Sequence, residues 1–284
     1  MVHGPECIEA QFSWQEVLDI WKNFLPPIRP SIMDQQVYEG CIKKIKDRQG
    51  SSVLILGVTP ELRMLAIKYC CRVVAVDLHT VMIKAMNRLM DTFEFVTCNE
   101  VIVKGYWLAM PFRRGEYDLI LSDCSLNSLT KAETRRLLME VKRLLKEDGY
   151  ICMRVMIYPD EWTERSILDI FVKHRTRHRK NSKKILEDLY PEILCSIEAY
   201  DPISQKSSIA KARKEWRRLH HHNEISRLEF EAFEDVLAKG EYSPTILKRS
   251  EIQELLNQHF KTIYVKNGES KSMHCSPIYC LKPR

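Results

Sequence analysis

The chain begins with apolar side chains spaced like those of amphipathic helices. Between residues 12 and 25, and again over 32–47, apolar residues recur at intervals of three and four. This spacing predicts two helices. The proline-rich residues 26–30 between them predict a break, because proline cannot continue a helix. Residues 1–50 are therefore expected to form an N-terminal helical lid.

From residue 51 onward, short continuous apolar runs alternate with helical segments. Strands are predicted at residues 53–56, 72–76, 93–97, 117–121 and 150–157, the last after a turn at Asp148-Gly149. Helices are predicted at residues 60–69, 79–91 and 131–145, the last begun by the capping-box pattern of Thr130 and Glu133. This alternation is typical of a parallel sheet covered on both faces. Right-handed crossovers would place the carboxyl ends of the strands along one edge.

The alternation stops after residue 158 and resumes near residue 250. Residues 159–247 are interpreted as helices with charged surfaces, in which Trp216 is expected to pack, and a helix at 250–259 and strands at 262–265 and 278–281 follow. The predicted fold is α/β: a Rossmann-like, seven-stranded, mostly parallel sheet with helices on both faces. N-terminal helices precede the sheet, and a helical insertion stands before the last helix and strand pair.

The composition is that of an ordinary globular protein, with 45% hydrophobic and 29% charged residues in a chain of 284. No apolar run reaches the roughly 20 residues that span a bilayer, so no membrane partner is expected. Residues 1–14 show no secretory signal pattern. The ten cysteines are scattered and lack paired Cys-x-x-Cys spacings, which favours reduced thiols in a cytoplasmic protein and no metal site.

The net charge of +6 is mild and fits an anionic partner without specifying nucleic acid. Residues 172–184 carry seven Lys or Arg and no acid, and 211–222 form a second basic run. These runs could bind RNA phosphates or an acidic small molecule. Residues 160–247 nevertheless hold sixteen basic and sixteen acidic residues, so solvated helix faces are the simpler interpretation.

Histidines in the same region suggest two kinds of chemistry. His220, His221 and His222 are consecutive, and side chains about 100° apart on a helix cannot chelate one ion from a single face. One of them, or His174 or His178, could act as a general base toward a hydroxyl acceptor. The pattern does not choose among them.

The first predicted strand ends in a turn suited to a ligand. Gly57 follows the strand directly and permits close approach of a ligand to the backbone. Pro60 is favourable at the first helical position, and free N–H groups at a helix start can hold an anionic group. An ordinary structural turn is the alternative.

The other strand ends agree with a ligand site. Asp77 ends the second strand twenty residues after Gly57, where a carboxylate can accept hydrogen bonds from both ribose hydroxyls of an adenosine ligand. Its alternative role is to cap the next helix. Gly105, Tyr106 and Trp107 follow the third strand, and Asp123, Cys124 and Ser125 follow the fourth. Together these positions favour adenosine binding.

Four segments carry a family resemblance: LGVTPEL, VVAVDLHTVMI, GYWLAMPFRRGEYDLILSDCSLNSL and LLMEVKRLLKEDGYICMRV. In their order and spacing the chain resembles class I S-adenosylmethionine-dependent methyltransferases, most of all a bacterial-type group with a Thr-Pro-Glu-Leu loop in place of Gly-x-Gly. The likeness covers about residues 50–158, and residues 247–283 look like the family's last helix and two final strands. It implies an enzyme that uses S-adenosyl-L-methionine to methylate an O or N acceptor, less often C.

The resemblance also implies roles for individual residues. The methionine portion would be wrapped by Gly57, Val58, Thr59, Pro60 and Glu61. Asp77 would hold the ribose, with Leu78 and Met82 against the adenine. Tyr106 stands where the family usually has an acidic residue, so adenine recognition would rest on backbone groups and Trp107. Asp123 and Ser125 would line the site near the sulfonium.

The expected organisation is a lid at 1–50, a cofactor-binding core at 51–158, a substrate cap at 159–247 and a completing segment at 248–284. Tyr38 of the lid could reach the cofactor's carboxylate or belong to the core. A small-molecule acceptor is favoured because the cap is charge-balanced. RNA methylation through the basic runs and a non-catalytic, methyltransferase-like binding protein remain alternatives. A nicotinamide-dependent oxidoreductase ranks lower, because the three-glycine turn is missing and Glu61 would repel a diphosphate.

Overall fold

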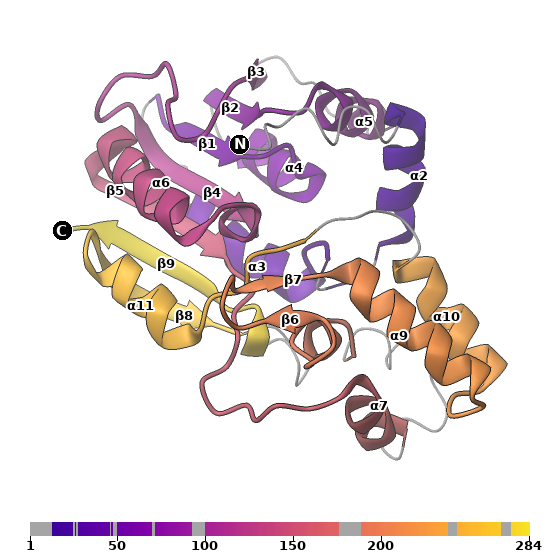
Figure 1. Ribbon diagram of the computed structural model, residues 1–284. Coiled ribbons are helices and arrows are strands. Elements are labelled where there is room, and N and C mark those ends of the chain that lie inside the picture. Colours follow the sequence, from indigo (N-terminus) through magenta and orange to yellow (C-terminus); the bar gives the residue numbers. More distant parts are fainter. Residues whose placement is uncertain are drawn as a thin grey trace.

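A central sheet of seven strands organises the computed structural model (Figure 1). The structure describes residues 13–24, 26, 28–45, 47, 50–69, 72–92, 100–175, 189–237, 243–267 and 274–284. The strand order is β3-β2-β1-β4-β5-β9-β8. Strands β1 to β5 are mutually parallel, and β9 runs antiparallel to both neighbours. The predicted Rossmann-like fold is therefore confirmed.

The strands follow the predicted apolar runs closely. Their bounds are β1 Ser52–Leu56, β2 Arg72–Asp77, β3 Glu100–Lys104, β4 Tyr117–Asp123, β5 Leu145–Arg154, β8 Phe260–Lys266 and β9 Ile278–Pro283. The expected third strand at 93–97 lies outside the described residues, and the strand that pairs with β2 is β3. As an edge strand, β3 is only half-buried, so its short apolar run gives a weak signal.

The turn predicted at Asp148-Gly149 is wrong, because β5 runs through both residues. Gly149 sits at an irregularity in the pairing of β4 with β5. A Cβ atom there would lie 3.0 Å from the carbonyl oxygen of Lys146 and 3.1 Å from that of Tyr117. Glycine is thus required by close backbone approach within the strand and does not mark a turn.

Helices cover both faces of the sheet (Figure 1). One face packs against α2 (Trp14–Asn23), α3 (Ile32–Lys43), α4 (Pro60–Tyr69) and α5 (Thr80–Met90), and the other against α6 (Lys131–Leu144) and α11 (Arg249–Asn257). The capping box of Thr130 and Glu133 at the start of α6 is confirmed. None of the helices in the described part of the chain is long and apolar enough to cross a membrane.

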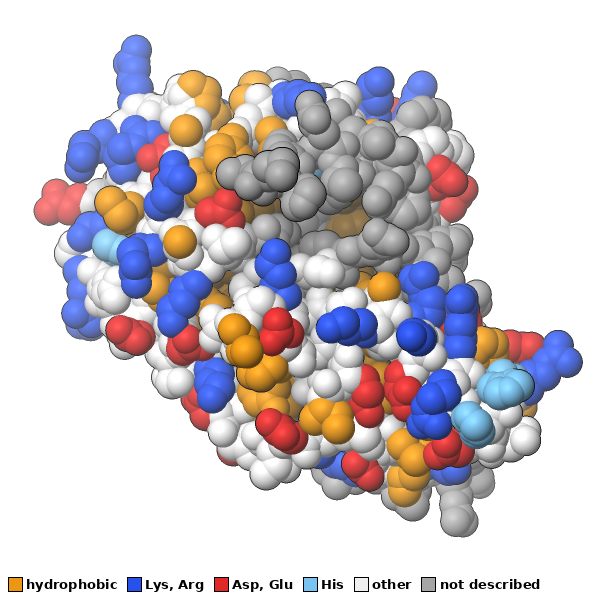
Figure 2. All heavy atoms as spheres, in the orientation of Figure 1, with side chains coloured by type: hydrophobic (Ala, Val, Ile, Leu, Met, Phe, Trp, Pro, Cys, Tyr) orange, Lys and Arg blue, Asp and Glu red, His pale blue; other side chains and the backbone are white. Residues whose placement is uncertain are grey.

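Residues 160–247 form a part with its own apolar core. They contain α7 (Ile167–Arg175), a helical stretch at 189–194, α9 (Ile209–His221) and α10 (Arg227–Leu237). A short hairpin, β6 (Tyr200–Asp201) with β7 (Lys206–Ser207), was not predicted. As expected, Trp216 packs at the centre of this core, with its ring centroid 4.9 Å from that of Phe233. On the face in Figure 2, acidic and basic side chains are interspersed.

The strand order places a crevice above the carboxyl ends of β1 and β4. From β1 the chain moves to β2 and β3 on one side, and later to β4 and β5 on the other, so the connections diverge at this point. Ligands of open α/β sheets bind at such a switch point. Leu56 pairs with both Val76 and Ser122, so the residues that follow these three lie level at the edge.

Candidate functional site

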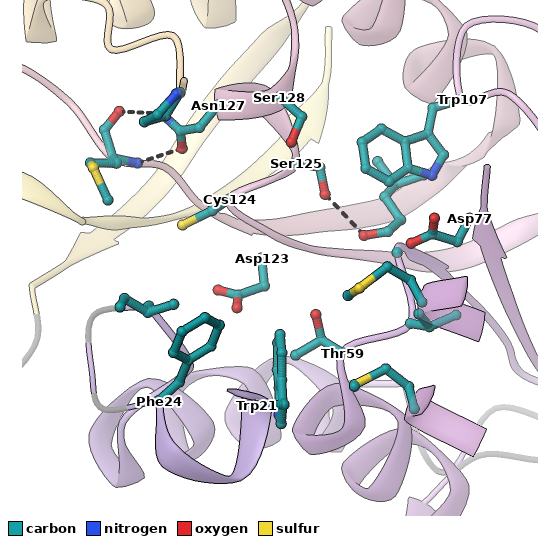
Figure 3. A pocket seen from close by; sticks show the side chains of 18 of the residues that line it. Trp21, Phe24, Thr59, Asp77, Trp107, Asp123, Cys124, Ser125, Asn127 and Ser128 are labelled. Atoms are coloured by element: carbon teal, nitrogen blue, oxygen red, sulfur yellow. Dashed lines mark hydrogen bonds between the residues drawn. The ribbon is translucent and has the colours of Figure 1, made fainter. Parts of the chain in front are cut away.

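A cavity of about 340 Å³ lies at this switch point. Its walls come from the ends of β1, β2 and β4, from α2 and α5, and from Met156, Tyr190, Leu194, Ile209 and Pro244. Figure 3 shows Asp77 and Trp107 toward one end, Cys124, Asn127 and Phe24 toward the other, and Thr59, Asp123 and Ser125 between them. The cavity thus joins the strand ends to the segments that cover them.

Gly57 gives the cavity wall its backbone conformation. Its φ of +104° lies where side-chain-bearing residues are strained. The Gly57 N–H donates to the carbonyl oxygen of Val76 at 2.8 Å, which ties the end of β1 to β2. A Cβ atom at this position would lie 3.9 Å from Asp77 Oδ2 and 3.9 Å from Trp107 Cζ2. The Gly57 backbone and the Asp77 carboxylate therefore face the same hollow.

Asp77 is almost fully buried at the end of β2. Its Oδ1 accepts the N–H of His79 at 2.9 Å, while His79, not Asp77, is the N-cap residue of α5. Oδ2 is the oxygen on the side of Gly57. Burial raises the pKa of Asp77, and hydrogen bonding to the N–H groups of His79 and Leu78 opposes that rise. A ligand hydroxyl donating to Oδ2 would offset part of the burial cost.

Trp107 and Tyr106 point in different directions although they are neighbours. The indole Nε1–H of Trp107 donates to the carbonyl oxygen of Val76 at 2.7 Å, and this fixes the ring against the cavity. Tyr106 is 40% exposed and donates its hydroxyl to Glu133 at 3.2 Å. Only Trp107 lines the cavity, so the structure does not place Tyr106 at the predicted site.

Asp123 lines the cavity on top of a buried charge network. The guanidinium of Arg154 donates from Nε to Asp123 Oδ1 at 2.6 Å and from Nη2 to Oδ2 at 3.1 Å. Its Nη1 donates to Asp34 at 3.3 Å. Burial raises the pKa of Asp123, and the charge and hydrogen bonds of Arg154 act against that rise. Arg154 was missed by the sequence analysis, and its only signal was a cation inside the apolar run of residues 150–157.

Two hydrogen-bonded side chains hold the strand ends together. Ser125 donates its hydroxyl to the carbonyl oxygen of Leu56 at 2.9 Å, joining β4 to β1. The Asn127 amide donates to the carbonyl oxygens of Met156 and Thr245, each at 2.8 Å, and accepts the Met156 N–H at 2.9 Å. Asn127, which the sequence analysis also missed, thereby fixes residue 245 over the edge of the sheet.

The predicted loop after β1 divides between cavity wall and support. Val58 and Thr59 line the cavity, as does Met82 of α5. Pro60, Glu61 and Leu78 do not. Glu61 is buried and accepts a hydrogen bond from Arg29 Nε at 2.8 Å. The Glu61 carboxylate therefore links the loop to the N-terminal region.

Residues 56–153 match the family model described as a methyltransferase domain. The chain therefore contains a methyltransferase domain, which spans about a third of its length and includes strands β2 to β4 and most of β5. No curated protein matches the chain significantly. The domain assignment thus rests on the match of residues 56–153 and agrees with the strand order of the sheet.

Solved structures share the fold of this chain at low identity. The CcbJ methyltransferase from Streptomyces caelestis aligns with a TM-score of 0.59 and 10% identity, covering 94% of this chain and 96% of that one. A Rhodobacter sphaeroides protein named for Zn-dependent alcohol dehydrogenases aligns at 0.56 and 15%, covering 96% and 99%. A Pyrococcus horikoshii OT3 protein aligns at 0.52 and 12%, covering 93% and 98%. At these identities the likeness shows the fold alone.

Several other residues considered from the sequence lie outside the cavity. His174 contacts Glu192 at 3.0 Å in the core of residues 160–247, and the His220 ring stacks on Phe230. His178 lies outside the described residues. Tyr38 is a core residue whose hydroxyl donates to the carbonyl oxygen of Ser122. Within the described ranges, no three His, Cys, Asp or Glu side chains are grouped to hold a metal ion.

Proposed function

We propose that this methyltransferase binds S-adenosyl-L-methionine in the cavity and methylates a small-molecule acceptor at O or N, less often at C. One observation carries the proposal: Gly57 and the Asp77 carboxylate face one hollow at the switch point of the sheet. An adenosyl group suits a site where a glycine backbone allows close approach and a neighbouring carboxylate can accept hydrogen bonds from both ribose hydroxyls.

Residues along the cavity wall suit successive parts of the cofactor. Gly57, Val58 and Thr59 would hold the methionine portion, and Asp77 Oδ2 would accept the ribose hydroxyls. Met82, Met86 and Trp107 supply an apolar surface for the adenine. Ser125 and Asp123 would lie near the sulfonium. The remaining predicted residues would affect cofactor binding only indirectly, because they do not line the cavity: Pro60, Glu61, Leu78 and Tyr106.

The charge of the wall supports a sulfonium ligand over a dinucleotide. Both Asp77 and Asp123 line the cavity. Carboxylates in a partly dehydrated site attract a cation and repel a diphosphate. The nicotinamide alternative is therefore less favoured by the structure as well.

The protein's task in methyl transfer is to align the acceptor and exclude water. S-adenosylmethionine, when bound, would supply a methyl group on its positively charged sulfur for transfer to a lone pair of the acceptor. Trp21 and Phe24 from the N-terminal region, with Leu194 and Ile209 from the far side, cover the cavity. These residues would exclude water from the reacting groups.

The surface contacts favour a small acceptor over RNA. Three arginines of the basic runs are already paired: Arg175 with Glu229 at 3.1 Å, Arg217 with Glu234 at 2.8 Å, and Arg218 with Glu215 at 2.7 Å. Paired guanidinium groups offer fewer free positive charges to phosphates. A cavity beside charge-balanced helices suits a molecule small enough to enter it whole.

Isothermal calorimetry with S-adenosylhomocysteine tests the proposal. We expect wild-type protein to bind and Asp77→Ala to bind about 10- to 100-fold more weakly, the loss expected when a carboxylate that accepts hydrogen bonds is removed. Asp91→Ala, at the exposed end of α5, is the control and should bind like wild type. Absence of binding by the wild-type protein, or tighter binding of NADH, would overturn the proposal.

A further inference from the structure

The cavity has two chemically different ends (Figure 3). The end proposed for the adenosyl group carries Asp77 and the Gly57 backbone. The opposite end is built from apolar side chains contributed by three separate parts of the chain. These are Phe24, Ile28, Met156, Leu194 and Ile209, of which the last four pack in the apolar core of residues 160–247. Binding of a ligand at such an end is favourable when it removes apolar surface of the ligand from water.

The polar side chains at this end are already engaged with the protein. Both N–H groups of the Asn127 amide donate to backbone carbonyls. Between the two ends, both oxygens of Asp123 accept from Arg154. Burial raises the pKa of the Cys124 thiol to about 12, so this group is neutral at physiological pH. A charged ligand would lose its water here and find these groups already bonded.

The net charge of the wall disfavours an anionic ligand in particular. Asp77 and Asp123 both line the cavity, and the Arg154 guanidinium lies fully buried in bonds to Asp123 and Asp34. Among the described residues that line the cavity, none is Lys, Arg or His. A phosphate or carboxylate on the acceptor would be dehydrated beside two carboxylates, at a large electrostatic cost.

We infer that the apolar end receives an uncharged acceptor with an aromatic or branched aliphatic body, bound next to the methyl group. This inference rests on the proposed function, because the other end must hold the cofactor. It narrows the acceptor from any small molecule to neutral, largely apolar ones, and it excludes nucleotides and organic acids as preferred substrates.

Methionine side chains provide separate reporters for the two ends. Met82 and Met86 line the adenosyl end, and Met156 lines the apolar end. In protein labelled with ¹³C at the methionine methyl groups, with resonances assigned by Met→Leu variants, S-adenosylhomocysteine should shift the signals of Met82 and Met86. Added to the saturated protein, indole should shift that of Met156. Indole-2-carboxylate, its anionic counterpart, should bind at least about tenfold more weakly.

A matched pair of variants makes the test specific. Ile209→Asp places a carboxylate in the apolar end and should weaken indole binding by at least about tenfold, a loss of about 1.4 kcal/mol or more. Ile203→Asp, in the same region at a side chain 94% exposed, should leave it unchanged. Both variants should retain S-adenosylhomocysteine binding within about twofold, which also shows that they are folded.

The outcomes separate the two proposals. Equal binding of indole and its carboxylate, an unshifted Met156 signal, or indole affinity unaffected by Ile209→Asp would overturn the acceptor assignment while the cofactor proposal stands. If S-adenosylhomocysteine leaves Met82 and Met86 unshifted, the proposed function itself fails and the acceptor assignment falls with it.

Discussion

Arg154 determines the electrostatics of the cavity floor. Its side chain is fully buried and bonds both Asp123 and Asp34. A buried carboxylate without a partner takes up a proton, because burial disfavours its charge. The guanidinium supports the ionised form of Asp123, and the Tyr38 hydroxyl, which accepts the Arg154 N–H at 3.1 Å, fixes the backbone. One residue thereby supports a negative charge where a sulfonium is expected.

Trp107 and Tyr106 give a residue-scale prediction about adenine recognition. Trp107→Ala should weaken S-adenosylhomocysteine binding by about tenfold or more, because it removes the aromatic ring on which the adenine would pack. Such stacking contributes roughly 1–3 kcal/mol to binding. Tyr106→Ala should change the affinity less than about threefold, since that hydroxyl bonds Glu133 outside the cavity. Calorimetry on the two neighbouring variants checks this. A larger loss for Tyr106→Ala would show that the loop rearranges around the ligand.

Among the helices and strands, two features cannot be read from the hydrophobic periodicity of the sequence: the course of β5 through Gly149 and the ion pairs of Glu192. The strand β5 passes through Gly149 at an irregular register with β4. Within residues 160–247, Glu192 joins α7 to the helical stretch 189–194 by accepting from Arg165 at 2.8 Å, Lys173 at 3.2 Å and His174 at 3.0 Å. The register of β5 and the ion pairs of Glu192 both depend on partners in other segments of the chain.

Two glycine substitutions should have opposite effects on stability. Gly149→Ala should lower the free energy of unfolding by about 1–3 kcal/mol, because its Cβ would press on backbone oxygens that cannot rotate away. Gly40→Ala in α3 should raise it by about 0.5–1 kcal/mol, because its Cβ meets no atom within 4 Å and alanine favours helix. Urea denaturation of both variants measures this. Destabilisation by Gly40→Ala would argue against α3 as described.

Glu192 gives the stability a predicted pH dependence. Burial alone would raise its pKa, but the hydrogen bond and charge of His174, with Lys173 and Arg165, lower the pKa to about 2. The pKa of Glu192 is lower in the folded protein than the value near 4.5 expected for the unfolded chain. Ionised Glu192 therefore stabilises the fold at pH values above about 4.5, and this contribution is lost as the pH falls from there toward 2. We expect it to be about 2 kcal/mol, given that Lys173 is partly exposed.

The measurement compares urea midpoints of wild type and Glu192→Gln between pH 6 and pH 3. The difference in unfolding free energy between the two proteins should shrink as the pH is lowered. Glu231→Gln, at an exposed ion pair with Arg227, serves as control and should stay within about 0.5 kcal/mol of wild type. A difference that is constant with pH would contradict the depressed pKa.

For the whole molecule, the sequence predicted the sheet because its apolar runs are continuous and strongly buried. Gly57, Asp77 and Asp123 were found for the same reason: each stands at the end of such a strand, and the strand register brings them level. Arg154 and Asn127 were missed because their partners, Asp34 and Thr245, lie in other segments. The orientation of Tyr106 away from its neighbour Trp107 depends on Glu133, which no local pattern reveals.

The overall charge distribution predicts weak RNA binding despite the net charge of +6. Acidic partners occupy Arg175, Arg217 and Arg218, so few counterions would be released from a phosphate backbone. By fluorescence anisotropy, a 20-nucleotide single-stranded RNA should bind with a Kd above roughly 10 μM at 150 mM salt, within the non-specific range. Lowering the salt should tighten binding only modestly.

A triple variant distinguishes specific from diffuse attraction. Neutralising Arg175, Arg177 and Arg179 to Gln should leave both the RNA affinity at 150 mM salt and S-adenosylhomocysteine binding nearly unchanged. The matched control neutralises the exposed Arg88, Arg135 and Arg136. Sub-micromolar RNA binding with a steep salt dependence, lost in the first triple variant and kept in the second, would instead make the basic run of residues 172–184 a nucleic-acid site. In that case RNA would replace a small molecule as the expected acceptor.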